Sequence, residues 1–211
     1  MNLANKLTIF RIILVPIMVI IPYLNLQGSF YELPYTYFWM LLIFIVASIT
    51  DKLDGYIARS RKQVTTFGKF LDPLADKILV LSALILLVEL DKIPAWIPII
   101  VLAREFLVSG YRLVAVEKGG KVIAASIWGK LKTVTQMLAI ILIMFDKNAF
   151  AQCFNGTLSG AEFGLNIIST IMLIISVIAT IFSGIDYMKG GKELLKDKVN
   201  TWQKSESGVI Y

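Results

Sequence analysis

The chain has 211 residues, of which 57% are hydrophobic, and its mean hydropathy is +0.73. This composition excludes an ordinary soluble domain with a polar surface and indicates an integral membrane protein. The formal net charge is +6, and the single cysteine and the absence of histidine exclude an intramolecular disulfide, a thiolate metal cage and the usual general base.

Six apolar stretches approach the roughly 20 residues that a helix needs to cross a bilayer. We expect transmembrane helices over 7–26, 35–57, 70–90, 94–115, 130–146 and 163–186. The sequence has no signal-peptide layout, so we expect the first span to be retained. The predicted fold class is therefore all-α, an integral membrane bundle of six transmembrane helices within residues 1–186. A basic cytoplasmic tail is expected over 187–211.

The loops between these spans differ in their basic residues. Lysine and arginine gather in 59–69, in 112–132 and in the tail, whereas 27–34, 89–93 and 147–162 contain only Lys92 and Lys147. Since basic loops stay in the cytoplasm, both termini are expected there. We expect the plasma membrane of a bacterium. The basic tail is explained by topology and by attraction to anionic membrane lipids, and nothing beyond the charge favours nucleic acid as a partner.

Four aspartates stand at the cytoplasmic ends of the second and third spans, at positions 51, 54, 72 and 76. Their spacing places Asp51 and Asp54 on one helix stripe and Asp72 and Asp76 on another. A short loop makes the two helices antiparallel neighbours, so the two pairs are expected to face each other. Pro73 is compatible with its helix only in the first turn, which would place Asp72 close to a helix N-terminus.

Ionised carboxylates inside a membrane protein are costly, at about 2.5–3.5 kcal/mol each near a helix centre, and four together also repel. Divalent cations bound by oxygen ligands would explain such a cluster. We expect two Mg²⁺ or Mn²⁺ ions about 3.5–4 Å apart, an arrangement suited to displacement at phosphorus. Gly55, Ala58 and Gly68 would leave room for a ligand, although close helix packing explains these small residues equally well.

The segment from Asp51 to Asp76 reads D-x-x-D-G-x-x-A-R, then eight residues, then G-x-x-x-D-x-x-x-D. It resembles, at every specified position, the signature of the CDP-alcohol phosphatidyltransferases. The resemblance implies a six-helix membrane enzyme, usually a homodimer. Such an enzyme transfers a phosphatidyl or similar group from a CDP-linked donor to an alcohol and releases CMP.

The resemblance also implies roles for single residues. The metals are bound by Asp51, Asp54, Asp72 and Asp76. The CDP pocket is shaped by Gly55, Ala58, Arg59 and Gly68. Asp76 is in addition the favoured general base, and in a chain without histidine a carboxylate is the plausible group to take the proton of the attacking hydroxyl.

Two further regions resemble those family members that make phosphatidylglycerophosphate. The opening from Asn2 to Arg11 is similar to their N-x-P-N-x-L-T-x-x-R segment, with Ala4 where proline is usual. Residues 104–112 and 128–133 are similar to their R-E…R and G-K-x-K-T segments. The expected substrates are therefore CDP-diacylglycerol and sn-glycerol 3-phosphate, and the expected products are phosphatidylglycerophosphate and CMP.

Basic side chains are expected to gather beside the aspartates. Cations next to an acidic metal site favour an acceptor that bears a phosphate. The candidates to bind that phosphate are Arg104, Arg112, Lys130 and Lys132. The alternative is that these are flanking charges of the positive-inside rule, which adequately explains Lys118 and Lys121. For Arg104 an internal ion pair with Glu105 is at least as well supported as a substrate contact.

Other functions are open at this point. A cardiolipin synthase of the same fold would use phosphatidylglycerol as acceptor and would need fewer cations. A cation transporter would use the aspartates as an ion path, but it predicts carboxylates spread across the membrane depth. A purely structural membrane protein leaves the clustered acids unexplained.

Overall fold

The computed structural model describes residues 3–60, 66–117 and 127–206, with side chains described for 5–51, 71, 74–112 and 127–189. The chain is 83% helical, which confirms the prediction of a nearly all-α protein. Its α-helices are α1 (Leu3–Ile20), α2 (Tyr35–Ser60), α3 (Thr66–Glu89), α4 (Trp96–Glu117), α5 (Ile127–Phe145) and α6 (Gly160–Glu206). Two short 3-10 helices, η1 (Ile21–Leu24) and η2 (Gln152–Asn155), follow α1 and α5.

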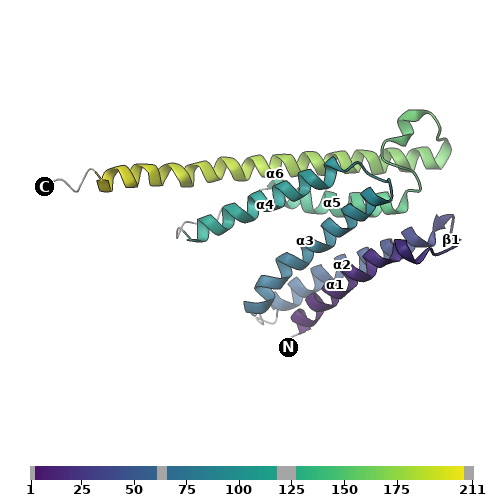
Figure 1. The fold of residues 1–211 in the computed structure, drawn as a ribbon, viewed down its shortest axis with the longest axis horizontal. Coiled ribbons are helices and arrows are strands. Elements are labelled where there is room, and N and C mark those ends of the chain that lie inside the picture. The colour runs from purple at the N-terminus through teal and green to yellow at the C-terminus, as the bar shows by residue number, and fades with distance from the viewer. Residues whose placement is uncertain (1–2, 61–65, 118–126, 207–211) are drawn as a thin grey trace.

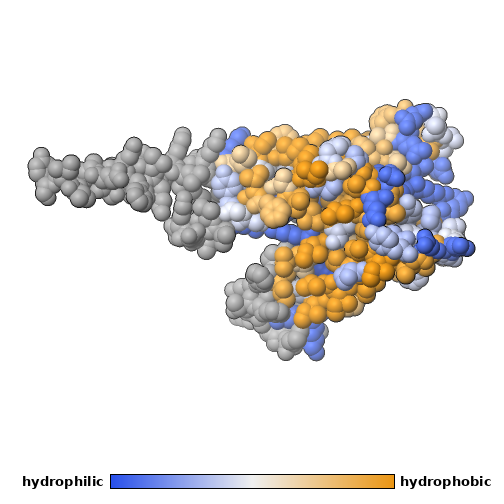
Figure 2. Space-filling view, viewed as in Figure 1, coloured by the Kyte–Doolittle hydropathy of each residue, from blue (hydrophilic) through white to orange (hydrophobic). Residues whose placement is uncertain are grey.

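The surface of the helices is that of a membrane protein. In the described part of the chain, three segments are long and apolar enough to cross a bilayer: Asn5–Leu24, Ile127–Phe145 and Gly160–Lys189. Figure 2 shows a broad hydrophobic band over the middle of the molecule and hydrophilic residues at the end that carries the loops. An apolar surface of this extent indicates contact with lipid rather than water. Crossing of the membrane by every α-helix stays a prediction.

The helices pack as two groups of three (Figure 1). In one group α1 lies against α2 and α3, and in the other α6 lies along α5 and α4. Contacts of α2 with α5 and of α3 with α4 join the groups. The fully buried side chains of this joint core come from both groups and include Phe44, Leu84, Ile97, Ile140 and Leu173. The junction brings α3, α4 and α5 together, and the polar residues discussed below lie on these helices.

The face of α6 that packs inward carries small hydroxyl side chains. Ser169, Ser176 and Ser183 recur at two-turn intervals and are almost fully buried. Small residues allow membrane helices to approach closely, because there is no hydrophobic drive between helices in lipid. Ser169 donates to Asp146 Oδ2 at 2.7 Å, and Ser183 accepts from Arg104 at 2.5 Å. The same stripe therefore packs the helix and binds charged residues of its neighbours.

One end of the bundle gathers the connections after α1, α3 and α5 (Figure 1). Lys92, which is 3% exposed, lies there in the connection between α3 and α4. Its ammonium donates to the backbone carbonyl oxygens of Asp146 at 2.9 Å, Lys147 and Asn148 at 3.4 Å, which follow the end of α5. Lys147 itself pairs with Glu32. The two basic residues of these loops are therefore both engaged in structural contacts.

A two-stranded hairpin stands at the same end, where the sequence analysis expected only a loop. β1 (Ser29–Phe30) pairs antiparallel with β2 (Leu33–Pro34). Tyr31 and Glu32 between them have φ angles of 45° and 66°. Positive φ at both central residues fits a type I′ turn, whose twist matches that of the strands. The usual Asn-Gly or Asp-Gly sequence is absent, so the pattern did not reveal the hairpin.

The expected start of the third helix is wrong. Helix α3 begins at Thr66, seven residues before Pro73, so this proline is not in the first turn. A proline inside a helix removes one backbone hydrogen bond, which membrane helices tolerate because neighbouring groups compensate. The last helix extends beyond its expected span of 163–186, since α6 continues through Gly190 and Gly191 to Glu206, while its apolar part is Gly160–Lys189. The predicted tail thus begins inside α6.

Candidate active site

A polar cavity of about 190 Å³ lies between α3, α4 and α5. Three apolar residues, Val80, Leu81 and Val101, form part of its wall. Its ionisable lining residues are Asp76, Lys77, Arg104, Glu105, Arg112 and Lys132, and Thr133 and Gln136 complete the polar lining. Four cations and two carboxylates give this lining a formal charge of +2. A concave site with an excess of positive charge favours a ligand with two negative charges.

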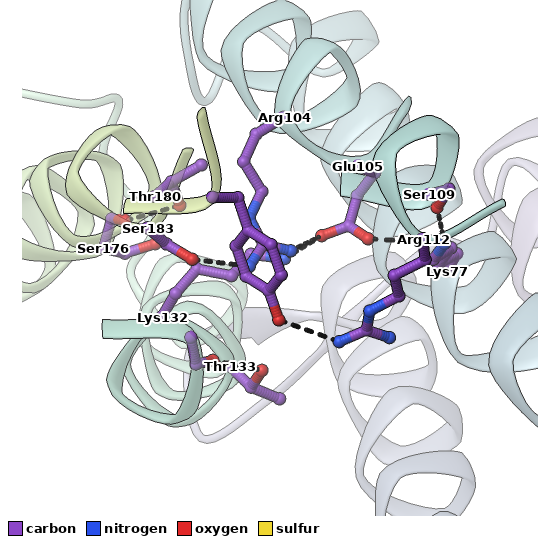
Figure 3. A network of polar contacts seen from close by, with 12 residues as sticks. Lys77, Arg104, Glu105, Ser109, Arg112, Lys132, Thr133, Ser176, Thr180 and Ser183 are labelled. Carbon is purple, nitrogen blue, oxygen red and sulfur yellow. Dashed lines mark hydrogen bonds and ion pairs between the residues drawn. The ribbon is translucent and has the colours of Figure 1, made fainter. Parts of the chain in front are cut away.

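Glu105 on α4 stands at the centre of the cations (Figure 3). Its Oε1 is 2.5 Å from Lys132 Nζ and 2.9 Å from Arg104 Nη1. Its Oε2 is 3.7 Å from Lys77 Nζ, and the same ammonium donates to Ser109 Oγ at 2.5 Å. One carboxylate therefore holds cations from three helices together. The ion pair that the sequence suggested for Arg104 and Glu105 is confirmed.

Helix α6 fixes the two guanidinium groups from the other side. Arg104 Nη2 donates to Ser183 Oγ at 2.5 Å (Figure 3). Arg112 Nη2 donates to Tyr187 Oη at 2.9 Å. Both guanidinium carbons also lie over the ring of Tyr187, at 5.6 and 5.7 Å from its centroid. A guanidinium has five N–H donors. These contacts orient the groups and leave further donors for a ligand.

Asp76 on α3 also lines this cavity. Its Oδ1 is buried and has no hydrogen-bond partner among the residues that the structure describes. The carboxylate lies within electrostatic range of Asp51, Lys132 and Arg11. A buried acceptor without a donor is unfavourable by about 1–3 kcal/mol or more. A metal ion or the hydroxyl of a bound substrate would satisfy it.

Asp51 on α2 has a partner that the sequence analysis did not anticipate. Arg11 on α1 is fully buried, and its Nη1 lies 2.8 Å from Asp51 Oδ1. A buried charge is stable only when it is paired. The arginine at the end of the N-terminal motif thus has a structural reason to be there, because it balances one of the four aspartates.

The two described carboxylates, Asp51 and Asp76, have the chemistry that the expected metal ions require. Asp51 and Asp76 offer oxygen ligands, which Mg²⁺ and Mn²⁺ prefer, and the orphaned oxygen of Asp76 is an acceptor that a cation would satisfy. No group of three or more potential metal-binding side chains occurs among the described residues. The other expected residues of this site have side chains outside the described part: Asp54, Asp72, Gly55, Ala58, Arg59 and Gly68. Their backbones belong to α2 and α3.

The structure brings together three of the four residues expected to bind the acceptor phosphate. Arg104, Arg112 and Lys132 line the cavity with Asp76. Lys130 is exposed and is not one of the lining residues. The α-helical period explains the difference, because residues two apart point to different sides of a helix.

Lys77 and Gln136 also line the cavity and were not expected there. A signal for both was present. Each is a polar residue within an expected span, and a polar side chain at membrane depth indicates function more often than packing. Tyr187, the partner of Arg112, carried no such signal because it lies where the tail was expected to begin.

Comparison with known proteins is consistent with this geometry. Residues 1–182 match the family model described as CDP-alcohol phosphatidyltransferase. A Bacillus subtilis (strain 168) protein named CDP-diacylglycerol–glycerol-3-phosphate 3-phosphatidyltransferase is 40% identical over 200 residues, which cover 92% of this chain and 97% of that protein. A Haemophilus influenzae protein of the same name is 41% identical over 94% of this chain and 97% of its own length. A Mycobacterium tuberculosis protein named probable phosphatidylglycerophosphate synthase is 36% identical over 89% and 80%.

Proposed function

We propose that this chain, which belongs to the CDP-alcohol phosphatidyltransferase family, transfers a phosphatidyl group from CDP-diacylglycerol to sn-glycerol 3-phosphate. The products are phosphatidylglycerophosphate and CMP. The cavity with a formal charge of +2 beside Asp76 carries the proposal. The names of relatives about 40% identical to this chain support the same donor and acceptor.

The acceptor phosphate binds among the cations of the cavity. A phosphate monoester carries close to two negative charges at neutral pH, which matches the excess of two cations in the lining. Arg112 and Lys132 provide charge-assisted hydrogen bonds, and the guanidinium can contact two phosphate oxygens at once. Free glycerol has no group for these contacts.

Asp76 takes the proton of the attacking hydroxyl. As the hydroxyl oxygen of the acceptor bonds to the phosphorus of the phosphatidyl group, the bond from that phosphorus to the CMP oxygen breaks. The proton of the hydroxyl passes to the carboxylate, whose Oδ1 is free of other donors among the described residues. General-base catalysis of this kind contributes about 10²- to 10⁴-fold.

Two divalent cations, Mg²⁺ or Mn²⁺, complete the proposed site. Their ligands are Asp51, Asp54, Asp72 and Asp76. When bound, the ions neutralise the charge that develops on the pyrophosphate of the donor. The remaining residues of the family pattern hold the CDP group: Gly55, Ala58, Arg59 and Gly68.

The protein is further proposed to act as a homodimer in the bacterial cell membrane, with its active site open to the cytoplasm. The unequal distribution of lysine and arginine among the loops supports this orientation. Both termini are then cytoplasmic, and the end with the hairpin is external. The homodimer is proposed because members of this family usually form one.

Release of CMP from CDP-diacylglycerol by the purified protein tests this function. The assay contains Mg²⁺ and, in separate reactions, sn-glycerol 3-phosphate, glycerol or phosphatidylglycerol. We expect CMP release with glycerol 3-phosphate and little with the other two acceptors. Release with phosphatidylglycerol and none with glycerol 3-phosphate would identify a cardiolipin synthase instead.

A further inference from the structure

Three buried polar atoms of one cavity have no hydrogen-bond partner within the described part of the chain. They are Asp76 Oδ1, Arg104 Nε and Gln136 Nε2, and all three residues line the cavity between α3, α4 and α5. Unpaired buried donors and acceptors are unfavourable, and native proteins pair nearly all of them with protein, water or ligand. The cavity lining therefore offers a ligand one buried acceptor and two buried donors.

Gln136 is the most informative of the three, because the reaction proposed above gives it no role. Its side chain is 2% exposed. It lies on α5 one helical turn after Lys132, so the two side chains share a face of the helix. The amide of Gln136 therefore lies beside Lys132, one turn further from the start of α5. Its NH₂ group is a donor that carries no charge.

We propose that Gln136 is a specificity-determining residue, whose Nε2 donates a hydrogen bond to the hydroxyl of the acceptor that does not react. This inference rests on the proposed function. Glycerol 3-phosphate has a phosphate at one end, a reacting hydroxyl at the other and a second hydroxyl on the central carbon. The cations bind the phosphate and Asp76 faces the reacting hydroxyl, so the central hydroxyl is left for an uncharged donor in the same cavity.

The acceptor lacking only the central hydroxyl provides a direct test. This acceptor is 3-hydroxypropyl phosphate, which keeps the phosphate and a primary hydroxyl. One neutral hydrogen bond corresponds to about 2- to 13-fold in binding. We expect the wild type to have a kcat/KM higher by about this factor for glycerol 3-phosphate than for the analogue.

The variant Gln136→Met replaces the amide by an uncharged side chain of similar length. We expect the ratio between the two acceptors to fall to about one. Gln152→Met is the matched control, since Gln152 accepts a hydrogen bond from the backbone of Ala149 in the loop after α5. It should keep the wild-type ratio.

Each outcome bears on the inference. A wild-type ratio near one would overturn it without any variant, so a folding defect in Gln136→Met does not remove the test. A wild-type ratio retained in Gln136→Met would overturn it too, and would indicate that water satisfies the amide. A wild type that releases CMP with neither acceptor would overturn the proposed function, and this inference with it.

Discussion

At the scale of single residues, the site is organised by a few buried charges. Glu105 binds Lys132 and Arg104 directly, and Arg11 pairs with Asp51. A buried charge needs a partner, and removal of one member leaves the other unpaired in a medium where that is costly. The acidic and the cationic groups are therefore held in place before any substrate binds.

Asp76→Asn tests the role of the base. The amide cannot take the proton of the acceptor hydroxyl, and we expect kcat to fall by about 10²-fold or more. Asp186→Asn on α6 is the matched control, because Asp186 is not one of the lining residues of the cavity. Initial rates of CMP release measure both variants. Wild-type turnover in Asp76→Asn would exclude this carboxylate as the base.

Removal of divalent cations tests the metal site. We expect a chelator to abolish CMP release and added Mg²⁺ or Mn²⁺ to restore it, because the donor carries a pyrophosphate whose charge must be neutralised. Asp51→Asn should also abolish CMP release, because it removes a metal ligand and the charge that balances the buried Arg11. Full activity of the wild type in excess chelator would contradict the metal hypothesis.

At the scale of the elements, Lys92 joins the segment between α3 and α4 to the loop that follows α5. Lys92 holds the loop after α5 through the three backbone carbonyl oxygens of residues 146–148, and its ammonium lies 4.5 Å from the centroid of the Tyr37 ring. Backbone carbonyl groups of a loop need a hydrogen-bond partner when they leave water. Lys92 provides this partner from another element.

Lys92→Met should therefore lower stability. Hydrogen bonds to a charged group contribute about 1.5–3 kcal/mol to the free energy of unfolding, and we expect a loss of this order. Lys147→Met is the matched control, because its pair with the exposed Glu32 contributes about 0–1 kcal/mol. Thermal unfolding in detergent compares them. An equal loss of stability in both variants would contradict this role of Lys92.

The contribution of Lys92 should also depend on pH. Burial lowers the pKa of Lys92 from its ordinary 10.5 to about 8, and the carboxylate of Asp146 opposes this shift. Between these two values the unfolded chain binds more protons, so the Lys92 contribution to stability increases as the pH rises. We expect the advantage of the wild type over Lys92→Met to be larger at about pH 9.5 than at about pH 7.5. The neutral amine still donates to the carbonyl oxygens.

The sequence predicted a nearly all-α protein, because apolar stretches of spanning length recur along the chain. It did not predict the hairpin, whose Tyr31 and Glu32 adopt positive φ only in the context of the fold. It also placed the start of α3 too late, since proline usually stands in a first turn and Pro73 lies further inside. Local preferences gave way to packing in both places.

At the scale of the whole molecule, the distribution of lysine and arginine predicts that both termini are cytoplasmic. Cysteine labelling tests it in a Cys153→Ser background, because Cys153 is the single natural cysteine and is buried. Asn155→Cys and Lys6→Cys place a thiol at exposed positions in the loop before α6 and near the start of α1. In intact cells an impermeant reagent should label position 155 and spare position 6. The reverse pattern would invert the topology.

The sequence predicted much of the candidate site through its charged residues. Three of the expected phosphate-binding residues meet at one cavity, yet the role of Lys77 and the pairing of Arg11 with Asp51 came only from the structure. Spacing shows which residues share a face of one helix. It does not show which helix lies opposite, because contacts between helices depend on the packing of the whole bundle.

We expect the cavity to bind the acceptor phosphate, while the metal ions and the CDP pocket hold the donor. Arg112→Gln tests it, with Lys130→Gln as the matched control, because Arg112 lines the cavity and Lys130 does not. Initial rates are measured with each substrate varied in turn. We expect Arg112→Gln to raise KM for glycerol 3-phosphate roughly 10- to 150-fold and to leave KM for CDP-diacylglycerol nearly unchanged, with little effect of Lys130→Gln. Equal weakening toward both substrates in Arg112→Gln, or the larger effect in Lys130→Gln, would contradict this assignment.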